Sequence, residues 1–481
     1  MLWIALELPA LPLQIAERGG SRPSPFAIAE GPAQRPVVLC ANAAARDAGV
    51  REGMAVAAAK ALASALESKP RDPVAERAAL ERLAGWACQF TPMVAIEAGG
   101  LVLEIEESLR LFGGLAKLTG AIRQGVRALG FHATYGVAPT PLAARLFARA
   151  EAQGVSMRAC LDAVELPARV GELPLFLTDW PARSIALLTD LGVLRFRDVL
   201  ALPRAGLAKR FGPEVGVSLD RVLALLPDPR EPYIPHARFH SKLELPAEAK
   251  SVEAILFPLK RLLVEMEGFL RGRGAGVQRL VVELEHSSRA CTRLPLEFGS
   301  PEREADFVLS IAREKLSRTS LAAPAIGLKL HAEALLEFKP REESWLPGRE
   351  EQAVDRARLL ERLAARLGEG RVFGIALAND HRPERSWLAR RPTAPRTSFD
   401  GGPRPVWLLH RPQRLIAEEG QPKLQGALDL VAGPERIESG WWDGEPVGRD
   451  YFVAVNPAGE ALWVYREHRN PAAWYLHGVF A

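Results

Sequence analysis

The chain has few cysteines and no long apolar runs, and each shortage excludes a class of protein. Its 481 residues include four cysteines, Cys40, Cys88, Cys160 and Cys291, with no CxxC pair and no histidine at ligand spacing. This pattern argues against a zinc site and a disulfide framework, so we expect four reduced, buried thiols. The longest apolar runs, such as residues 322–326, are far shorter than the roughly 18 to 20 residues of a bilayer span, which excludes an integral membrane protein.

A strong charge of one sign is also missing. The 62 Lys and Arg residues oppose 58 Asp and Glu residues, for a formal net charge of +4. This balance is too mild to indicate a polyanionic partner by itself, so only local clusters of Lys and Arg can indicate one. The N-terminal string MLWIALELPALPLQ has no basic segment before its apolar part and contains Glu7, so it does not read as a signal peptide. The expected location is the cytoplasm.

The patterning of strands and helices predicts five regions. The first combines strands and helices, including an Ala-rich helix over 41–66 and a hairpin that turns at Gly99-Gly100. The second has short helices only. The third has the order β-α-β-β-α-β, with its first helix over 252–271, and the fourth is a Pro/Gly-punctuated linker followed by a helix and a strand. The fifth alternates short aromatic strands with turns, so the chain is expected to be an α+β multidomain protein with a small β-rich C-terminal domain. These regions are residues 1–165, 166–235, 236–336, 337–400 and 401–481.

Three strings in the first part of the chain resemble the Y-family translesion DNA polymerases. ANAAARDAGVREGM (41–54) resembles that family's fingers string ANYEARKFGVRSGM, and YGVAPTPLAARLFA (135–148) resembles its string GIAPNKLLAKIAS. LEIEESLRLFGG (103–114) lies where the family has its acidic hairpin, SIDEAFLD. The resemblance covers about the first 335 residues. It implies a palm with fingers, a helix-hairpin-helix thumb and a little finger for the first three regions.

The same resemblance implies that catalytic residues have been lost. The family binds two divalent ions through an Asp in its first strand and an Asp-Glu pair in the hairpin. Matching the strings puts Ala5 at the first Asp and Glu106 and Glu107 at the pair, while Arg46 is a remnant of nucleotide binding. The resemblance therefore implies a non-catalytic chain with no metal and no cofactor. The alternative is an active DNA polymerase in which Glu7, on the same strand face as Ala5, joins the other two glutamates around Mg²⁺.

Strings at both ends of the chain resemble the ImuB group, which are catalytically degenerate, polymerase-like proteins of bacterial translesion mutasomes. The N-terminal string quoted above and ESLRLFGG carry this resemblance, together with GPERIESGWWDGEPVGRDYFVA and LWVYREHRNPAAWYLHGVF near the C-terminus. The resemblance implies a scaffold for mutagenic DNA repair in the SOS response. The implied partners are damaged primer-template DNA, the sliding clamp, an ImuA-type RecA-like protein and a DnaE-type error-prone polymerase.

Basic residues in the second and third regions are the candidate DNA contacts. Two short helices around Gly192 are expected to point backbone N–H groups toward a phosphate, which a side chain at this position would obstruct. Each basic residue can also be an ordinary surface cation. The candidates are Arg183, Arg195, Arg197, Lys209 and Arg210 in the second region, and Lys242, Arg271, Arg273, Arg289 and Arg293 in the third.

The linker segment EESWLPG (342–348) is the candidate site for the sliding clamp. Clamp-binding peptides are exposed and extended with apolar plugs, and Trp345 with Leu346 fits that description, although the usual leading Gln is absent. The alternatives are that Trp345 docks on a neighbouring domain, or that the clamp motif lies at 421–424.

Aromatic residues near the C-terminus are candidate contacts for protein partners. Trp441 and Trp442 are adjacent in a turn, where at least one is expected to face solvent or a partner. Trp463 and Trp474 are expected to lie in the core. The string LWVYRE (462–467) alternates along a strand, and we expect so small a domain to be unable to bury both of its faces.

Overall fold

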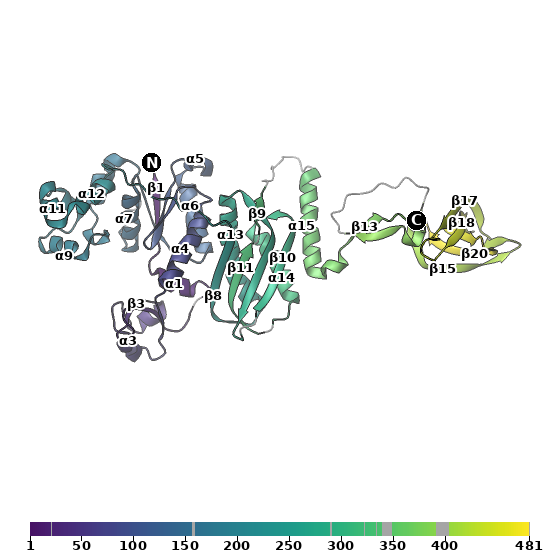
Figure 1. Ribbon diagram of the computed structural model, residues 1–481, viewed down its shortest axis with the longest axis horizontal. Helices are drawn as coiled ribbons and strands as arrows, with labels where there is room; N and C mark the ends of the chain where they lie inside the picture. The colour runs from purple at the N-terminus through teal and green to yellow at the C-terminus, as the bar shows by residue number, and fades with distance from the viewer. Residues whose placement is uncertain are drawn as a thin grey trace. The chain divides into compact units, whose positions relative to one another are not determined.

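The computed structural model describes residues 1–20, 22–155, 159–288, 291–321, 323–332, 334–338, 349–390 and 404–480. Its contacts divide the chain into two compact units, Met1–Glu351 and Gln352–Ala481 (Figure 1). The first three expected regions therefore lie in one compact unit. The second unit begins inside the expected linker region, 49 residues before the C-terminal domain predicted from the sequence (401 − 352 = 49).

A four-stranded antiparallel sheet forms the centre of the N-terminal part. Its order is β5-β6-β1-β7. Strand β1 is buried on both faces because helices cover the sheet from both sides. Ile4 and Leu6 pack with α4 (Pro73–Ala87) and α6 (Leu115–Ala128), while Ala5 packs with α7 (Pro141–Ala152). The strands are β1 (Trp3–Glu7), β5 (Val94–Glu97), β6 (Gly100–Glu104) and β7 (Thr134–Ala138).

The prediction of a long helix over 41–66 is wrong. This segment continues strand β3 and then forms two short helices, because Gly49 and Gly53 adopt φ angles of +94° and +78° that an α-helix cannot contain. Strand β3 joins a small sheet of order β3-β2-β4 beside α1. The elements are α1 (Leu11–Glu17), β2 (Phe26–Glu30), β3 (Val37–Ala41), α2 (Ala43–Asp47), α3 (Val56–Leu62) and β4 (Glu67–Pro70).

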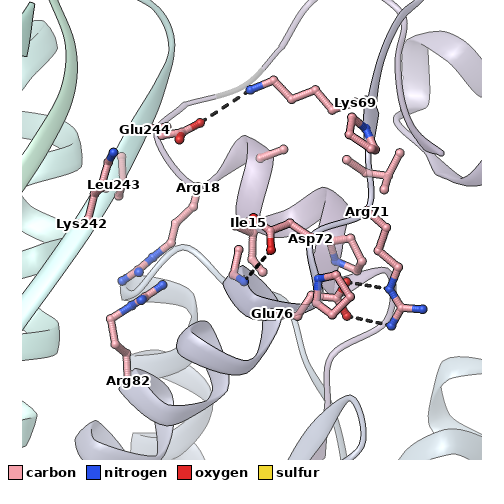
Figure 2. A pocket seen from close by; sticks show the side chains of 16 residues that line it. Ile15, Arg18, Lys69, Arg71, Asp72, Glu76, Arg82, Lys242, Leu243 and Glu244 are labelled. Atoms are coloured by element: carbon pink, nitrogen blue, oxygen red, sulfur yellow. Dashed lines mark hydrogen bonds and ion pairs between the residues drawn. The ribbon is translucent and has the colours of Figure 1, made fainter. Parts of the chain in front are cut away.

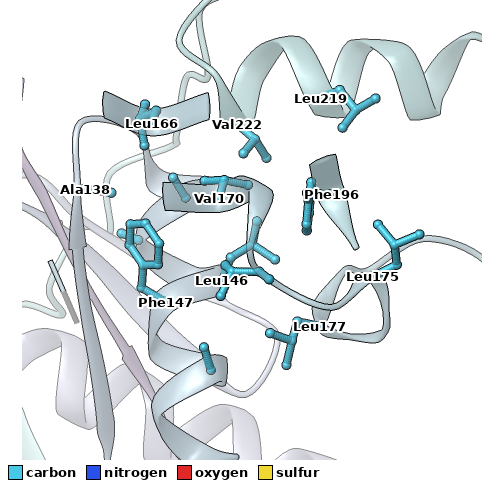
Figure 3. Packing of buried hydrophobic residues seen from close by; sticks show 14 of the residues in the cluster. Ala138, Leu146, Phe147, Leu166, Val170, Leu175, Leu177, Phe196, Leu219 and Val222 are labelled. Carbon is cyan, nitrogen blue, oxygen red and sulfur yellow. The ribbon is translucent and has the colours of Figure 1, made fainter. Parts of the chain in front are cut away.

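Short helices fill the chain between residues 163 and 222 and share a core with the central sheet. Figure 3 shows Phe147 of α7 beside Leu166 and Val170, with Phe196 and Leu219 completing the cluster. The helices are α8 (Leu166–Gly171), α9 (Ala182–Asp190), α10 (Phe196–Leu200), α11 (Arg204–Phe211) and α12 (Pro213–Val222).

A second antiparallel sheet follows, in the order β10-β9-β11-β8. Helices α13 and α14 pack against one face, where residues such as Leu243, Val282 and Leu328 are buried. The alternate residues lie on the other face, called the open face below. The elements are β8 (Phe239–Ala249), α13 (Val252–Gly272), β9 (Ala275–His286), β10 (Cys291–Glu302), α14 (Ala305–Arg318) and β11 (Ala325–Ala332), with β12 (Leu336–Glu337) beside β9.

The second unit contains helix α15 (Arg349–Leu367) from Gln352 onward, a hairpin and a six-stranded antiparallel sheet of order β16-β15-β20-β19-β18-β17. The expectation for LWVYRE is wrong, because Trp463 and Val464 point to opposite faces and both are buried. One face carries a cluster with Trp474, and the other stacks Trp463 on Tyr451, so two small cores sandwich the sheet. The strands are β13 (Gly374–Leu377), β14 (Trp387–Arg390), β15 (Trp407–Glu418), β16 (Gln421–Lys423), β17 (Asp429–Ser439), β18 (Val447–Val455), β19 (Ala461–Glu467) and β20 (Asn470–Val479).

The cysteines follow the expected pattern in part. All four are free thiols, and Cys40 and Cys160 are buried, but Cys291 is exposed at the start of β10. Among the helices that the structure describes, none combines the length and the apolar character that a bilayer crossing requires.

Candidate functional site

The predicted catalytic glutamates lie at opposite ends of β1. Glu7 ends the strand and pairs with Gly100 at the start of β6. Glu106 lies beyond the other end, where its carboxylate is 2.6 Å from the amino group of Met1. At about 3.4 Å per residue, the strand separates the two carboxylates by on the order of 15 Å. The structure therefore does not bring Glu7 together with Glu106 and Glu107, as the polymerase alternative requires.

Ala5 is fully buried under α7. Arg46 is exposed on α2, where its guanidinium donates to the carbonyl oxygen of Ala41 over 2.8 Å. Within the part of the chain that the structure describes, no group of three or more His, Cys, Asp or Glu side chains is arranged to hold a metal ion.

The carboxylate of Glu7 is bound by an arginine that sequence reasoning missed. Arg145 of α7 is 6% exposed, and its Nε donates to Glu7 over 2.9 Å. Its Nη1 lies 3.0 Å from Glu97 and 3.1 Å from Asp179. Burial opposes the charged form, but the charges of Glu7 and Asp179 outweigh it and raise the pKa of Arg145. A signal was present, because Arg145 stands where the family string GIAPNKLLAKIAS has its second Lys.

Two further arginines complete this group. Arg149 lies 2.7 Å from Asp179 and 3.5 Å from Glu7, and Arg230 donates to Glu97 and Asp228 over 2.5 Å each. We call Arg145, Arg149 and Arg230 with Glu7, Glu97, Asp179 and Asp228 the arginine–carboxylate cluster. Guanidinium groups match carboxylates in a fixed, multidentate geometry, so the cluster joins β1, the β5–β6 turn, α7 and the following helical segment.

The turn at Gly192 does not offer backbone N–H groups to a phosphate, which corrects the expectation. Gly192 is exposed with φ +78°, and its N–H donates to Thr189. The next N–H groups are also used inside the chain, since Val193 donates to Leu188. The carboxylate of Asp198 accepts from the N–H groups of residues 194 and 195, at 3.1 and 2.9 Å. A Cβ at Gly192 would meet no atom within 4 Å.

The basic candidates of the helical segment fall into two classes. Arg195 and Arg197 lie together, and both bind the carboxylate of Glu172, at 2.8 and 2.9 Å. Arg183 on α9 and the pair at the end of α11, Lys209 and Arg210, are exposed and make no ion pair with a described residue. The second class is available to bind phosphates through its side chains.

Two basic candidates lie on the open face of the second sheet, and both are paired with glutamates. Lys242 on β8 is 3.2 Å from Glu285, and Arg293 on β10 is 2.9 Å from Glu283. Lys329 on β11 also binds Glu285, at 2.7 Å. Pairing in register sets Lys242, Lys329, Glu283 and Arg293 in one row across the four strands.

The remaining candidates of this region do not join that row. Arg271 binds Glu267 over 2.5 Å at the end of α13, and Arg273 donates to the carbonyl oxygen of Pro235 over 2.6 Å. Three predicted residues, Arg289, Trp345 and Leu346, lie outside the described residues.

The adjacent tryptophans of the second unit are both exposed. Trp441 is 74% and Trp442 56% exposed, and their rings meet edge to face at 4.7 Å. The next residue, Asp443, anchors the turn by binding Arg382 over 2.5 Å. The alternative clamp motif differs, because Gln421–Lys423 is strand β16, paired with β15. It is therefore not an unpaired, extended peptide.

Comparison with known proteins covers nearly the whole chain. Residues 16–149 match the impB/mucB/samB family. Protein ImuB of Caulobacter vibrioides, strain NA1000 / CB15N, is 29% identical over 470 residues, covering 90% of this chain and 100% of that protein. The ImuB of strain ATCC 19089 / CIP 103742 / CB 15 gives the same values.

The solved structures that match part of this chain include DNA polymerases. DinB from Sulfolobus solfataricus is 17% identical with a TM-score of 0.39, covering 70% of this chain and 100% of that one. An insertion ternary complex of Dbh DNA polymerase is 17% identical with a TM-score of 0.41, covering 70% of this chain and 99% of that one.

Proposed function

We propose that this chain, which is ImuB-like along nearly its whole length, is a non-catalytic DNA-binding scaffold of a translesion synthesis complex. Its role is to hold damaged primer-template DNA and to recruit a DnaE-type error-prone polymerase, which carries out the synthesis at the sliding clamp. An ImuA-type RecA-like protein is the further partner of the complex.

The observation that carries the proposal is the guanidinium of Arg145 among the carboxylates at the end of β1. Two-metal nucleotidyl transfer needs carboxylates that converge and can bind hard cations. Glu7 and Glu97 instead bind Arg145, while Glu106 pairs with the N-terminal amine at the other end of the strand. A divalent ion at Glu7 would have to displace a buried, multidentate ion pair, and the ligands that complete a two-metal site are distant.

DNA binding is proposed to use the exposed basic side chains of the helical segment. Arg183, Lys209 and Arg210 have no carboxylate partner among the described residues, so they can neutralise phosphates without breaking an ion pair. Contacts of this kind are independent of base sequence, as a scaffold for lesions of many kinds requires.

Recruitment of protein partners is proposed for the second unit. Adjacent exposed tryptophans are uncommon on a surface without a partner, and Trp side chains are enriched at binding hot spots. Trp441 and Trp442 are exposed on a turn that the ion pair between Asp443 and Arg382 anchors. The clamp is proposed to bind the segment that contains Trp345 and Leu346.

A primer-extension assay with the purified full-length protein tests the proposal. With Mg²⁺ or Mn²⁺ we expect DNA binding without nucleotide incorporation. When the DnaE-type polymerase is added, DNA synthesis past a lesion should appear. Incorporation by the protein alone, abolished by Glu7→Ala or Glu106→Ala, would establish the polymerase alternative and refute the scaffold role.

A further inference from the structure

A cavity of about 640 Å³ lies where α1, the β4–α4 corner and β8 meet. Figure 2 shows Arg18, which follows α1, and Arg82 of α4 with their guanidinium groups next to each other at one side of it. Lys69 of β4 and Lys242 of β8 also line it, and the ammonium of Lys242 binds Glu285 on the open face. The cavity is distinct from the arginine–carboxylate cluster, with which it shares no residue.

Two of the guanidinium groups beside this cavity, those of Arg18 and Arg82, share one carboxylate. Glu265 of α13 is 1% exposed and binds Arg18. Its Oε1 lies 3.6 Å from the Nε of Arg82. Arg261, four residues before Glu265, donates to the carbonyl oxygen of Arg18 instead of to a carboxylate. Two cations therefore share one anion, and Arg261 adds a further positive charge next to Arg18, in a place where charges are ordinarily paired.

Burial and the surrounding positive charge lower the pKa values of two of these arginines. Burial lowers the pKa of Arg82, and the charge of Arg18 lowers it further, against the attraction of Glu265 and Glu81. Burial and the charge of Arg18 also lower the pKa of Arg261. In addition, the Nε–H of Arg82 and the Oε1 of Glu265 are both buried and have no hydrogen-bond partner among the described residues, because the 3.6 Å between them is too long for a hydrogen bond.

The neighbouring carboxylates do not supply the missing negative charge, because each is bound elsewhere. Glu76 binds Arg71 over 2.7 Å, and Glu81 binds Arg77 over 2.9 Å. Glu244 is 3.6 Å from Lys69 at the rim. Asp72 accepts hydrogen bonds from the first N–H groups of α4.

We propose that this cavity binds a phosphate-bearing anion, with Arg18 and Arg82 as the principal contacts and Lys69 at the rim. Paired guanidinium groups present several N–H donors in a planar arrangement that matches phosphate oxygens. The volume is in the range of small-molecule sites, roughly 300 to 1,000 Å³. The phosphate can come from a free nucleotide or from a nucleic-acid strand. The site does not depend on the scaffold function proposed above.

Calorimetric titration of the full-length protein with inorganic pyrophosphate tests the site. We expect saturable binding to the wild type, and affinity about tenfold or more weaker in Arg82→Gln, since the variant loses a charge-assisted hydrogen bond to the anion. Lys69→Gln changes only a half-exposed rim residue, so it cannot harm the core, and it should weaken binding severalfold. Arg127→Gln, an exposed arginine at the end of α6, has the same charge change and should bind like the wild type.

A second readout separates binding from folding. Without pyrophosphate, Arg82→Gln should melt at or above the wild-type temperature, because it removes one of the repelling cations. Wild-type affinity in both Arg82→Gln and Lys69→Gln, or no saturable binding to the wild type, would overturn the proposal.

Competition then identifies the source of the phosphate. Displacement of pyrophosphate by a deoxynucleoside triphosphate alone assigns a free nucleotide, and displacement by a single-stranded oligonucleotide assigns a nucleic-acid backbone. Displacement by neither would overturn both assignments of the phosphate's source, because neither a nucleotide nor a strand would then compete for the cavity. Loss of DNA binding in Arg183→Gln with pyrophosphate binding intact would separate this site from the DNA contacts.

Discussion

At the scale of single residues, Arg145 determines the chemistry at the end of β1. It is the side chain that binds Glu7 and Glu97 together, and both glutamates are largely buried. Removing one partner of a buried ion pair leaves charges in a place where water cannot solvate them.

We predict that Arg145→Met lowers the free energy of unfolding by about 3 to 5 kcal/mol, measured by urea denaturation of the full-length protein. The matched control is Arg77→Met, which removes an exposed arginine paired with Glu81 on α4 and should cost less than about 1 kcal/mol. Equal losses in the two variants would show that the arginine–carboxylate cluster does not stabilise the fold.

A buried histidine makes the second unit sensitive to acid. The ring of His477 is almost fully buried, and its Nδ1 lies 2.8 Å from the hydroxyl oxygen of Tyr451. Burial lowers the pKa of His477 from 6.5 to about 4. Below pH 6.5 the unfolded chain therefore binds a proton at His477, whereas the folded chain binds this proton only near pH 4 and below. The contribution of the neutral, buried His477 to the free energy of unfolding is therefore fully present above pH 6.5 and is lost as the pH falls toward 4.

We predict that the unfolding free energy of the second unit is roughly 2 kcal/mol smaller at pH 5 than at pH 7.5 because of this residue. Tryptophan fluorescence of the full-length protein follows the transition, since Trp463 stacks near His477. In His477→Gln this part of the pH dependence should disappear, whereas His132→Gln, an exposed histidine, should keep it. An unchanged dependence in His477→Gln would exclude His477 as its cause.

At the scale of elements, pairing across the second sheet decides how much positive charge its open face presents. Glu283 of β9 lies between Lys329 and Arg293 in one row, and also lies 3.5 Å from His331. The glutamates thus offset the cations that the sequence suggested for DNA.

We predict that Glu283→Gln strengthens binding to primer-template DNA severalfold at about 50 mM salt, because Arg293 then presents an uncompensated charge. The gain should shrink at about 200 mM salt. Fluorescence anisotropy measures both, and Glu253→Gln, at the exposed start of α13, is the control with the same charge change. Weaker or unchanged binding in Glu283→Gln would place the DNA away from this face.

The helical segment permits a comparison between paired and unpaired arginines. We predict that Arg183→Gln lowers the slope of log affinity against log salt by about one, as expected for the loss of one phosphate contact. Arg195→Gln should change the slope less, because Glu172 already neutralises Arg195. Fluorescence anisotropy at several salt concentrations measures the slope for each variant and for the wild type. Equal slopes in all three proteins would mean that this segment does not contact phosphates.

At the scale of the whole molecule, the boundary between the two units decides which truncation is informative. Arg382 binds Asp443, and Arg449 lies 3.0 Å from Glu384. A truncation at residue 400 would therefore separate the two partners of each ion pair, leaving Arg382 and Glu384 without theirs. The contacts place the division after Glu351.

We predict that deletion of residues 352–481 leaves DNA affinity within about twofold of the full-length protein, since the proposed phosphate contacts lie in the first unit. The same deletion should abolish association with the ImuA-type protein and the DnaE-type polymerase in a pull-down. Trp441→Ala with Trp442→Ala in the full chain is the matched variant, and should weaken that association without unfolding the unit. Retained association after the deletion would move recruitment into the first unit.

The sequence by itself determined the features that depend on local pattern. Its periodicity predicts a helix over 252–271, and α13 spans Val252–Gly272. Its turn residues predict the hairpin at Gly99-Gly100 and the exposure of at least one of Trp441 and Trp442, and both are exposed. These features follow from spacing and residue type within a few turns of the chain, so they can be predicted without knowing what packs against them.

Only the tertiary structure decided which distant residues meet. Glu7 and Arg145 are 138 positions apart, and no periodicity predicts that they pair. The register of β1 with β6 put Glu7 and Glu106 at opposite ends of one strand, although matched strings suggested a single site. Likewise, Trp463 and Val464 are both buried because neighbouring strands of the sheet and its connecting segments supply a core on each face. Strand register and long-range ion pairs depend on the packing of the whole unit, and a single sequence does not contain that information in local form.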